Sequence, residues 1–226
     1  MIEKVLFTWS GGKDSAMACH AIQAEGQLEI AALLTTLTRD YDRISMHGVR
    51  RDLLQRQAQA LGLDLEQVLL SKNATNSEYE EKMRLTLERR AKEGVRAVAF
   101  GDLFLEDIRA YREDNLSRIG MKGLFPLWGR DSRDLARSFL KLGFRAVVVC
   151  VDTKVLDRSH AGLPYDEAFV QRLPRGVDPA GENGEFHTFV FDGPIFHNPV
   201  SVETGEVVVR EGFAYCDLLP SPDKHP

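Results

Sequence analysis

Along the first two thirds of the chain, short apolar runs alternate with longer stretches that have helical periodicity. The apolar runs are rich in β-branched residues and predict buried strands at 5–9, 30–37, 65–70, 95–100 and 146–151. The amphipathic stretches predict helices at 14–25, 49–61 and 77–93, and helix, strand and helix recur from there up to residue 142. This alternation is typical of βαβ units, so we expect an α/β fold with a parallel sheet and helices on both faces.

The pattern changes after about residue 153. Prolines and glycines become frequent, and short strands are expected at 186–191 and 207–209. This pattern of short strands and frequent turns predicts a smaller α+β region that packs on the first part of the chain. We therefore expect a larger domain at 1–145 and a smaller region at 146–226 packed on it.

Composition narrows the set of partners. The net charge of −5 over 226 residues makes a nucleic-acid partner unlikely, because phosphate-backbone binders usually carry a basic excess. The three cysteines are widely spaced and include no Cys-x-x-Cys pair, so neither a disulfide framework nor a zinc site is expected and no residue is assigned as a metal ligand. With neither a membrane-length apolar stretch nor a secretory signal, the sequence predicts a cytoplasmic protein without membrane contact.

The clearest candidate for chemistry is the loop Ser10-Gly11-Gly12-Lys13-Asp14-Ser15, which follows a predicted strand and opens a predicted helix. Its glycines let the backbone approach an anion closely, and successive amides and the helix N-terminus direct positive dipole ends toward it. Lys13 adds a full charge and the serines add hydroxyl donors. The loop is not a Walker A motif, because Phe7 and Asp14 stand where that motif needs a glycine and a serine or threonine. It predicts an oligophosphate site of another type.

Two further clusters carry candidate chemistry. Gly101 and Asp102 end a predicted strand, and a predicted helix follows that carries Arg109 and Glu113 at i,i+4 spacing. The run 181–188, Gly-Glu-Asn-Gly-Glu-Phe-His-Thr, places carboxylates and an imidazole in a glycine-rich loop. Taken separately, these features are also explained by a solvated helix face and a tight turn.

Together, the three motifs resemble the diphthine–ammonia ligase family of PP-loop ATPases, in the adenine nucleotide α-hydrolase superfamily. The likeness runs from about residue 4 to residue 196, and the motif variants are closer to the bacterial branch. The resemblance implies a five-stranded parallel, Rossmann-like sheet of the HUP type. It also implies an AMP-forming carboxylate–ammonia ligase that uses ATP and Mg²⁺. A carboxylate would be activated as an acyl-adenylate with release of pyrophosphate, and ammonia would then form the amide.

The resemblance, with the chemistry of the side chains, also implies residue roles. The residues expected to be catalytic are Lys13, Glu185 and His187. The residues expected to contact ATP are Ser10, Gly11, Gly12, Lys13, Asp14, Ser15, Thr35, Gly101 and Asp102. The residues expected to contact the acceptor or ammonium are His47, Arg109, Glu113, Glu182 and Asn183. Two kinds of acceptor fit, the carboxylate of a small molecule and that of a protein side chain, and the pattern does not decide between them. Nor does it decide between a monomer and a homodimer, or identify the ammonia source.

Two other functions share parts of this pattern. A tRNA-modifying PP-loop enzyme would use the same loop and the same adenylation step, but thiolation usually needs a reactive cysteine pair. A nucleotide-binding sensor without turnover would need the pocket alone. We expect the ligase, with these two as alternatives.

Overall fold

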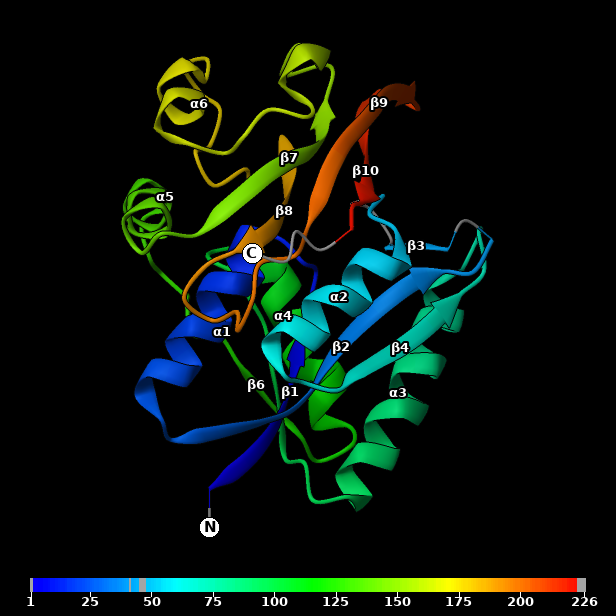
Figure 1. Cartoon of the computed structure of the whole chain (residues 1–226). Helices are drawn as coiled ribbons and strands as arrows, with labels where there is room; N and C mark the ends of the chain where they lie inside the picture. The colour runs from blue at the N-terminus through cyan, green and yellow to red at the C-terminus, as the bar shows by residue number, and fades with distance from the viewer. Residues whose placement is uncertain (1, 41, 45–47, 223–226) are drawn as a thin grey trace.

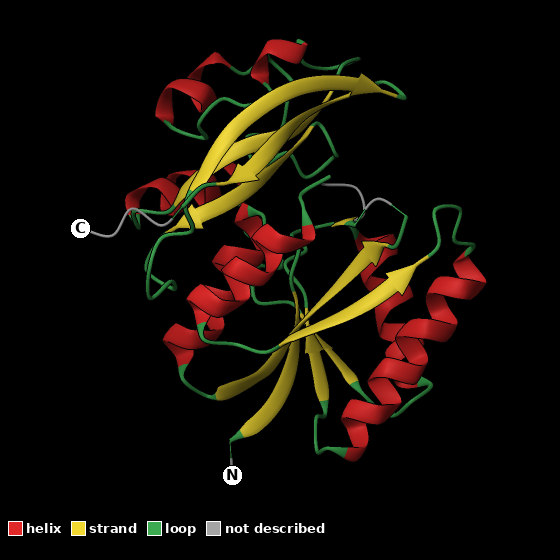
Figure 2. Cartoon of the chain, turned by 45° about the vertical axis from the view of Figure 1, so that its right-hand side comes forward, coloured by secondary structure: helices red, strands yellow, loops and turns green. Residues whose placement is uncertain are grey.

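The computed structural model describes residues 2–40, 42–44 and 48–222 and contains two sheets (Figures 1 and 2). The first sheet and its helices are β1 (Glu3–Thr8), α1 (Lys13–Glu25), β2 (Leu28–Thr38), β3 (Arg43–Ile44), α2 (Arg51–Leu61), β4 (Leu65–Leu70), α3 (Asn76–Lys92), β5 (Ala97–Ala99), α4 (Glu106–Ser117) and β6 (Lys122–Leu124). The second sheet and its helices are α5 (Ser132–Lys141), β7 (Arg145–Asp152), η1 (Arg158–His160), α6 (Glu167–Arg172), β8 (Phe186–Asp192), β9 (Val202–Arg210) and β10 (Phe213–Pro220).

The first sheet is the predicted parallel sheet. Its parallel strands lie in the order β4-β2-β1-β5-β6, and the two-residue strand β3 pairs antiparallel with the end of β2. Alternate side chains of β1 enter different cores: Phe7 packs with residues of α1 and α2, whereas Leu6 packs with residues of α3 and α4. Helices therefore cover both faces, which confirms the predicted α/β fold with five parallel strands.

The second sheet is antiparallel, with the strand order β8-β7-β10-β9. The strand at 146–151, which we counted with the parallel sheet, is β7 of this antiparallel sheet, and the fifth parallel strand is β6 instead. A continuous apolar run suits a buried strand in either kind of sheet, so the pattern alone did not separate the two. The predicted strand at 186–191 is β8, and the prediction at 207–209 covers only part of β9. Strand β10 was not predicted, because Asp217 and Pro220 interrupt its apolar pattern and its partners β7 and β9 are set by the tertiary fold. The smaller α+β region is confirmed, with one strand more than predicted.

The two sheets share one hydrophobic core. It runs from Phe7 and Trp9 of the first part through Val149 to Phe186 and Phe189 of the second. The carboxyl ends of the parallel strands therefore face the second sheet rather than open solvent (Figure 2). The division into a domain at 1–145 and a region at 146–226 stays a prediction. Within the described ranges, no helix has both the length and the apolar character needed to cross a membrane.

Candidate functional site

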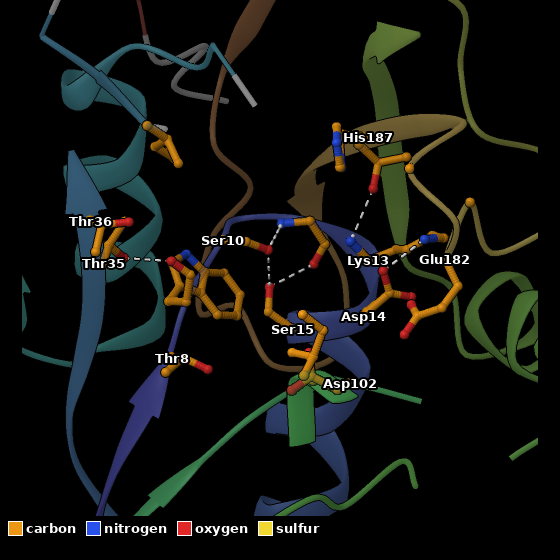
Figure 3. A pocket seen from close by; sticks show the side chains of 18 of the residues that line it. Thr8, Ser10, Lys13, Asp14, Ser15, Thr35, Thr36, Asp102, Glu182 and His187 are labelled. Atoms are coloured by element: carbon orange, nitrogen blue, oxygen red, sulfur yellow. Dashed lines mark hydrogen bonds and ion pairs between the residues drawn. The ribbon is translucent and has the colours of Figure 1, made fainter. Parts of the chain in front are cut away.

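A pocket of about 480 Å³ opens where the strand ends of the first sheet meet the second sheet (Figure 3). The predicted site residues that line it are Ser10, Gly12, Lys13, Asp14, Ser15, Thr35, Gly101, Asp102, Glu182 and His187. The predicted site residues that the structure describes but that do not line it are Gly11, Arg109, Glu113, Asn183 and Glu185. His47 lies outside the described residues. The pocket thus gathers segments that are more than 150 residues apart in the sequence.

The loop 10–15 needs its glycines for steric reasons. Gly11 has a φ of 78°, in the left-handed region, and a Cβ there would lie 2.6 Å from Oε1 of Gln57. A Cβ on Gly12 would lie 3.1 Å from the carbonyl oxygen of Thr188. Glycine is favoured at position 11 by the positive φ and by the nearby Gln57 side chain. At position 12 it is favoured because the backbone of Thr188 approaches closely. The loop can keep this shape only with little side-chain bulk at either position.

The second sheet holds the loop in place through β8. The hydroxyl of Thr188 accepts a hydrogen bond from the Lys13 amide at 3.0 Å, which ties β8 to the first residue of α1. The Val190 amide donates to the Gly11 carbonyl at 2.8 Å. These contacts join residues about 175 positions apart, so the phosphate loop and β8 form one structural unit.

Gln57 of α2 supports the same loop, although sequence reasoning gave it no role. Its side chain is fully buried. Its amide nitrogen donates to the carbonyl oxygens of Gly11 and Val190 at 3.0 and 2.6 Å, and its oxygen accepts from the Trp9 indole at 2.9 Å. The available signal was a polar residue among the buried leucines of an amphipathic helix, because a buried amide must find partners.

Lys13 and Asp14 form a partly buried ion pair on the wall of the pocket. Lys13 Nζ lies 2.8 Å from Asp14 Oδ2, and Lys13 is only 4% exposed (Figure 3). Asp14 Oδ1 is also buried and accepts no hydrogen bond from the residues that the structure describes. Burial raises the pKa of the Asp14 carboxyl, and the positive charge of Lys13 opposes that shift. The second carboxylate oxygen is therefore available to a cation that enters with a ligand.

Two more carboxyl groups face this pair. Glu182 Oε1 accepts a hydrogen bond from the Leu103 amide at 3.0 Å, which fixes the C-terminal loop against the end of β5. Burial raises the pKa of Glu182 to about 7, and the negative charge of Asp14 adds to the shift. Burial also raises the pKa of Asp102, against the effect of its ion pair with Arg112 at 3.0 Å. At neutral pH, the Glu182 carboxyl can therefore both take up and release a proton.

Glu185, predicted to be catalytic, lies inside the C-terminal loop rather than on the pocket wall. Its carboxylate is buried and accepts hydrogen bonds from the backbone amides of Asp178 and Asn183 and from the Asn183 side chain, all at 3.0 Å. His187, two residues further on, does line the pocket. Glu185 therefore stabilises the turn from which the side chains of Glu182 and His187 reach the pocket.

Helix α4 directs a different arginine into the pocket from the one predicted. Arg109 pairs with Glu113 at 2.8 Å, and its guanidinium lies over the ring of Trp128, 4.7 Å from the centroid. Arg112 lines the pocket, pairs with Asp102 and stacks on an aromatic ring. Positions three residues apart are neighbours on a helix surface, so periodicity alone does not decide which arginine faces a site.

Comparison with known proteins agrees with these motifs. The profile of the diphthamide synthase N-terminal domain matches residues 3–123, and that of the diphthamide synthase C-terminal domain matches residues 131–219. The diphthine–ammonia ligase of Homo sapiens is 30% identical over 234 residues, which are 92% of this chain and 86% of that protein. The enzyme of the same name from Rattus norvegicus is 28% identical over 235 residues, with the same two coverages.

A solved structure, described as a predicted subunit of tRNA methyltransferase from Methanocaldococcus jannaschii, matches 70% of this chain and 84% of its own. It has 18% identity and a TM-score of 0.40, so it bears on neither mechanism nor substrate. The profiles, by contrast, cover both sheets and all three motifs. The chain belongs to the diphthine–ammonia ligase family of PP-loop, ATP-dependent ligases.

Proposed function

We propose that this protein activates a carboxylate with ATP as an acyl-adenylate, releases pyrophosphate, and then forms an amide with ammonia. The observation that carries the proposal is the single pocket in which the loop 10–15 faces Glu182 and His187. Family membership supports ATP and ammonia as substrates. In this proposal residues 1–145 bind ATP, residues 146–226 supply the acceptor side, and the reaction takes place in the cytoplasm.

The triphosphate lies on the loop 10–15 in this proposal. The N-terminus of α1 and the ammonium of Lys13 offset the charge of the β and γ phosphates, which leave as pyrophosphate. Gly101 lets the end of β5 approach closely, because a Cβ there would lie 3.1 Å from backbone atoms of Asp14 and Ser15. The α phosphate then faces the pocket centre, where an acceptor carboxylate can reach it.

Adenosine lies toward the end of β2. Leu34, Ile44 and Met83 give this part of the pocket an apolar lining that suits a base. The Thr35 hydroxyl donates to the Trp9 carbonyl at 2.5 Å, so its contribution is to hold β2 against the start of the loop. The specificity for adenine comes from this edge of the pocket rather than from the phosphate loop.

The carboxylates present fit a magnesium ion that is shared with the phosphates. No group of three or more His, Cys, Asp or Glu side chains among the described residues is arranged to hold a metal alone. Mg²⁺ is usually held by one or two carboxylates together with substrate phosphates. Asp14, with its buried oxygen that lacks a hydrogen-bond donor, and Asp102 would hold it. The ion would neutralise charge on the departing pyrophosphate.

Ammonia enters on the side of Glu182 and His187. Ammonium must lose a proton before its nitrogen can attack the acyl-adenylate, and AMP then leaves with the bonding electron pair. Glu182 takes that proton in this proposal, because its pKa of about 7 matches the working pH of a general base. His187 also lines the pocket, and in this proposal it orients the acceptor.

Glu182→Gln should slow amide formation from ammonium. It should also remove the pH dependence of the rate that comes from the titration of this carboxyl. In the wild type, the rate should fall about tenfold for each pH unit below 7, because only the deprotonated Glu182 accepts a proton. The measurement is the pH profile of both proteins with ammonium and with hydroxylamine, which is largely uncharged at neutral pH. Hydroxylamine should restore much of the variant's rate. A variant with the wild-type profile would remove Glu182 from the mechanism.

Glu185→Gln should act mainly on stability. Glutamine cannot accept all three hydrogen bonds, so the free energy of unfolding should fall by about 1–3 kcal/mol, as measured by denaturant titration. The matched control is Glu88→Gln on the surface of α3, where loss of an exposed ion pair should cost less than about 1 kcal/mol. If the Glu185→Gln protein is as stable as the wild type but inactive, Glu185 has a catalytic role instead.

The buried cysteines argue against the tRNA-thiolating alternative. Cys19, Cys150 and Cys216 are all free and buried. Burial raises the pKa of Cys19 and of Cys150 to about 12, so neither thiol is a ready nucleophile at neutral pH. A persulfide-carrying cysteine pair therefore has no candidate among these residues, and the ligase reaction is the function that the pocket supports best.

Exchange of labelled pyrophosphate into ATP tests the adenylation step directly. Without ammonia, an acyl-adenylate re-forms ATP from pyrophosphate, so exchange should require the acceptor carboxylate. A panel of carboxylates can then identify the acceptor. Addition of ammonium should yield AMP as the nucleotide product. ADP and phosphate as products would mean that the reaction class is wrong.

A further inference from the structure

Strand β9 is a long edge of the second sheet with an apolar centre. It spans nine residues and pairs with β10 along one side, and no other described strand pairs with it (Figures 1 and 2). At its centre, Val207, Val208 and Val209 are 41%, 37% and 46% exposed.

Natural edge strands are usually protected by proline, charged side chains or a bulge, and the valine run at 207–209 itself holds none of these. A bulge of β9 lies beside the run, at Gly205 and Glu206, which together stand opposite one residue of β10. Glu206, Val208 and Arg210 line one cavity, so they still share a face of the sheet. An edge of this kind is suited to pair with another strand.

We propose that β9 pairs antiparallel with β9 of a second copy of this chain, about a two-fold axis through Val208. A two-fold axis that makes two identical strands antiparallel is perpendicular to the sheet, so each side chain stays on the same face in both copies. Residues can then face each other only if their numbers differ by an even amount, because side chains alternate between faces. This condition leaves few registers.

The charges on the strand select one of these registers. With Val208 on the axis, Val207 faces Val209 of the second copy, and Glu206 faces Arg210, so two opposite-charge pairs form by symmetry. A shift that centres Glu206 places two like charges opposite each other. The register centred on Val208 therefore pairs all three valines and both kinds of charge.

Other registers lack this complementarity. Centring Val207 places Glu203 opposite Glu211, and centring Val209 places Val207 opposite Glu211. Within the described part of the chain, the ion pairs beside β10 join Asp217 to arginines of the first sheet and leave Glu206 and Arg210 out. In the dimer, a second copy supplies an oppositely charged partner to Glu206 and to Arg210.

Charge reversal tests both the partner and the register. By sedimentation equilibrium across a wide range of concentration, the wild type should be a dimer. Glu206→Arg and Arg210→Glu, each alone, should weaken the dimer by about tenfold or more, because each places like charges opposite each other twice. The double variant exchanges the two charges and should restore the wild-type dimer.

Arg137→Glu is the matched control, because it reverses a charge on a side chain of α5 that is 78% exposed and should leave the mass unchanged. Circular dichroism spectra establish that each variant is folded. A monomeric wild type would overturn the proposal. A dimer that survives both single variants, or a double variant that stays monomeric, would place the interface elsewhere.

Discussion

Gly12→Val should lower the affinity for ATP by about 100-fold or more, which is about 2.7 kcal/mol. The site is tight here, since even a Cβ would lie 3.1 Å from the Thr188 carbonyl oxygen and would need β8 to shift by a few tenths of an ångström. A branched side chain must either push β8 away or fill the space in which the phosphates lie. The measurement is isothermal titration calorimetry with ATP and Mg²⁺.

Gly143→Ala separates this effect from a general cost of replacing glycine. Gly143 lies after α5 with a φ of 83°, and nothing lies within 4 Å of a Cβ built there. Alanine at this position should lower stability by about 1 kcal/mol and leave ATP affinity unchanged. Unchanged ATP affinity in a folded Gly12→Val protein would show that the triphosphate lies elsewhere.

Lys13→Met should lower the rate of AMP formation by about 10²–10³-fold, the usual effect of removing one fixed donor from a site of developing charge. The ammonium of Lys13 is almost fully buried and lies 2.8 Å from Asp14. Its loss removes a charge that stabilises the departing pyrophosphate. It also removes the group that opposes the raised pKa of Asp14, so this carboxylate becomes easier to protonate. Single-turnover measurements with saturating ATP give the chemical rate.

Lys82→Met is the matched control for this variant. Lys82 forms an ion pair of similar length, 2.7 Å with Glu78, but it lies on α3 with its side chain 32% exposed. Its replacement should leave the rate within about twofold of the wild type. Equal losses from both variants would indicate a general effect of charge and remove Lys13 from the reaction.

The sequence allowed the first sheet and its phosphate loop to be predicted because both depend on local signals. Strand and helix alternation follows from hydrophobic periodicity, and Gly11 and Gly12 mark a turn that few other residues can form. The motif at 181–188 was placed at the pocket through family resemblance. The structure brings Glu182 and His187 of this run to the pocket.

The direction of individual side chains could not be predicted in the same way. Whether Glu182 or Glu185 faces the pocket depends on the backbone dihedral angles of a turn that contains two glycines with positive φ. Whether Arg109 or Arg112 does so depends on which face α4 packs against the sheet. Gln57 had no motif, and its role follows from the position of β8, which only the tertiary fold determines.

A structure with Mg²⁺ and an ATP analogue that has a methylene group between the α and β phosphates tests the central claim most directly. We expect the β and γ phosphates against the backbone of residues 10–15, the base near Leu34 and the α phosphate facing Glu182. In-line attack then needs an acceptor oxygen about 3–3.5 Å from the α phosphorus, between the loop and His187. An analogue bound with its γ phosphate toward Glu182, or bound outside this pocket, would contradict the proposed chemistry.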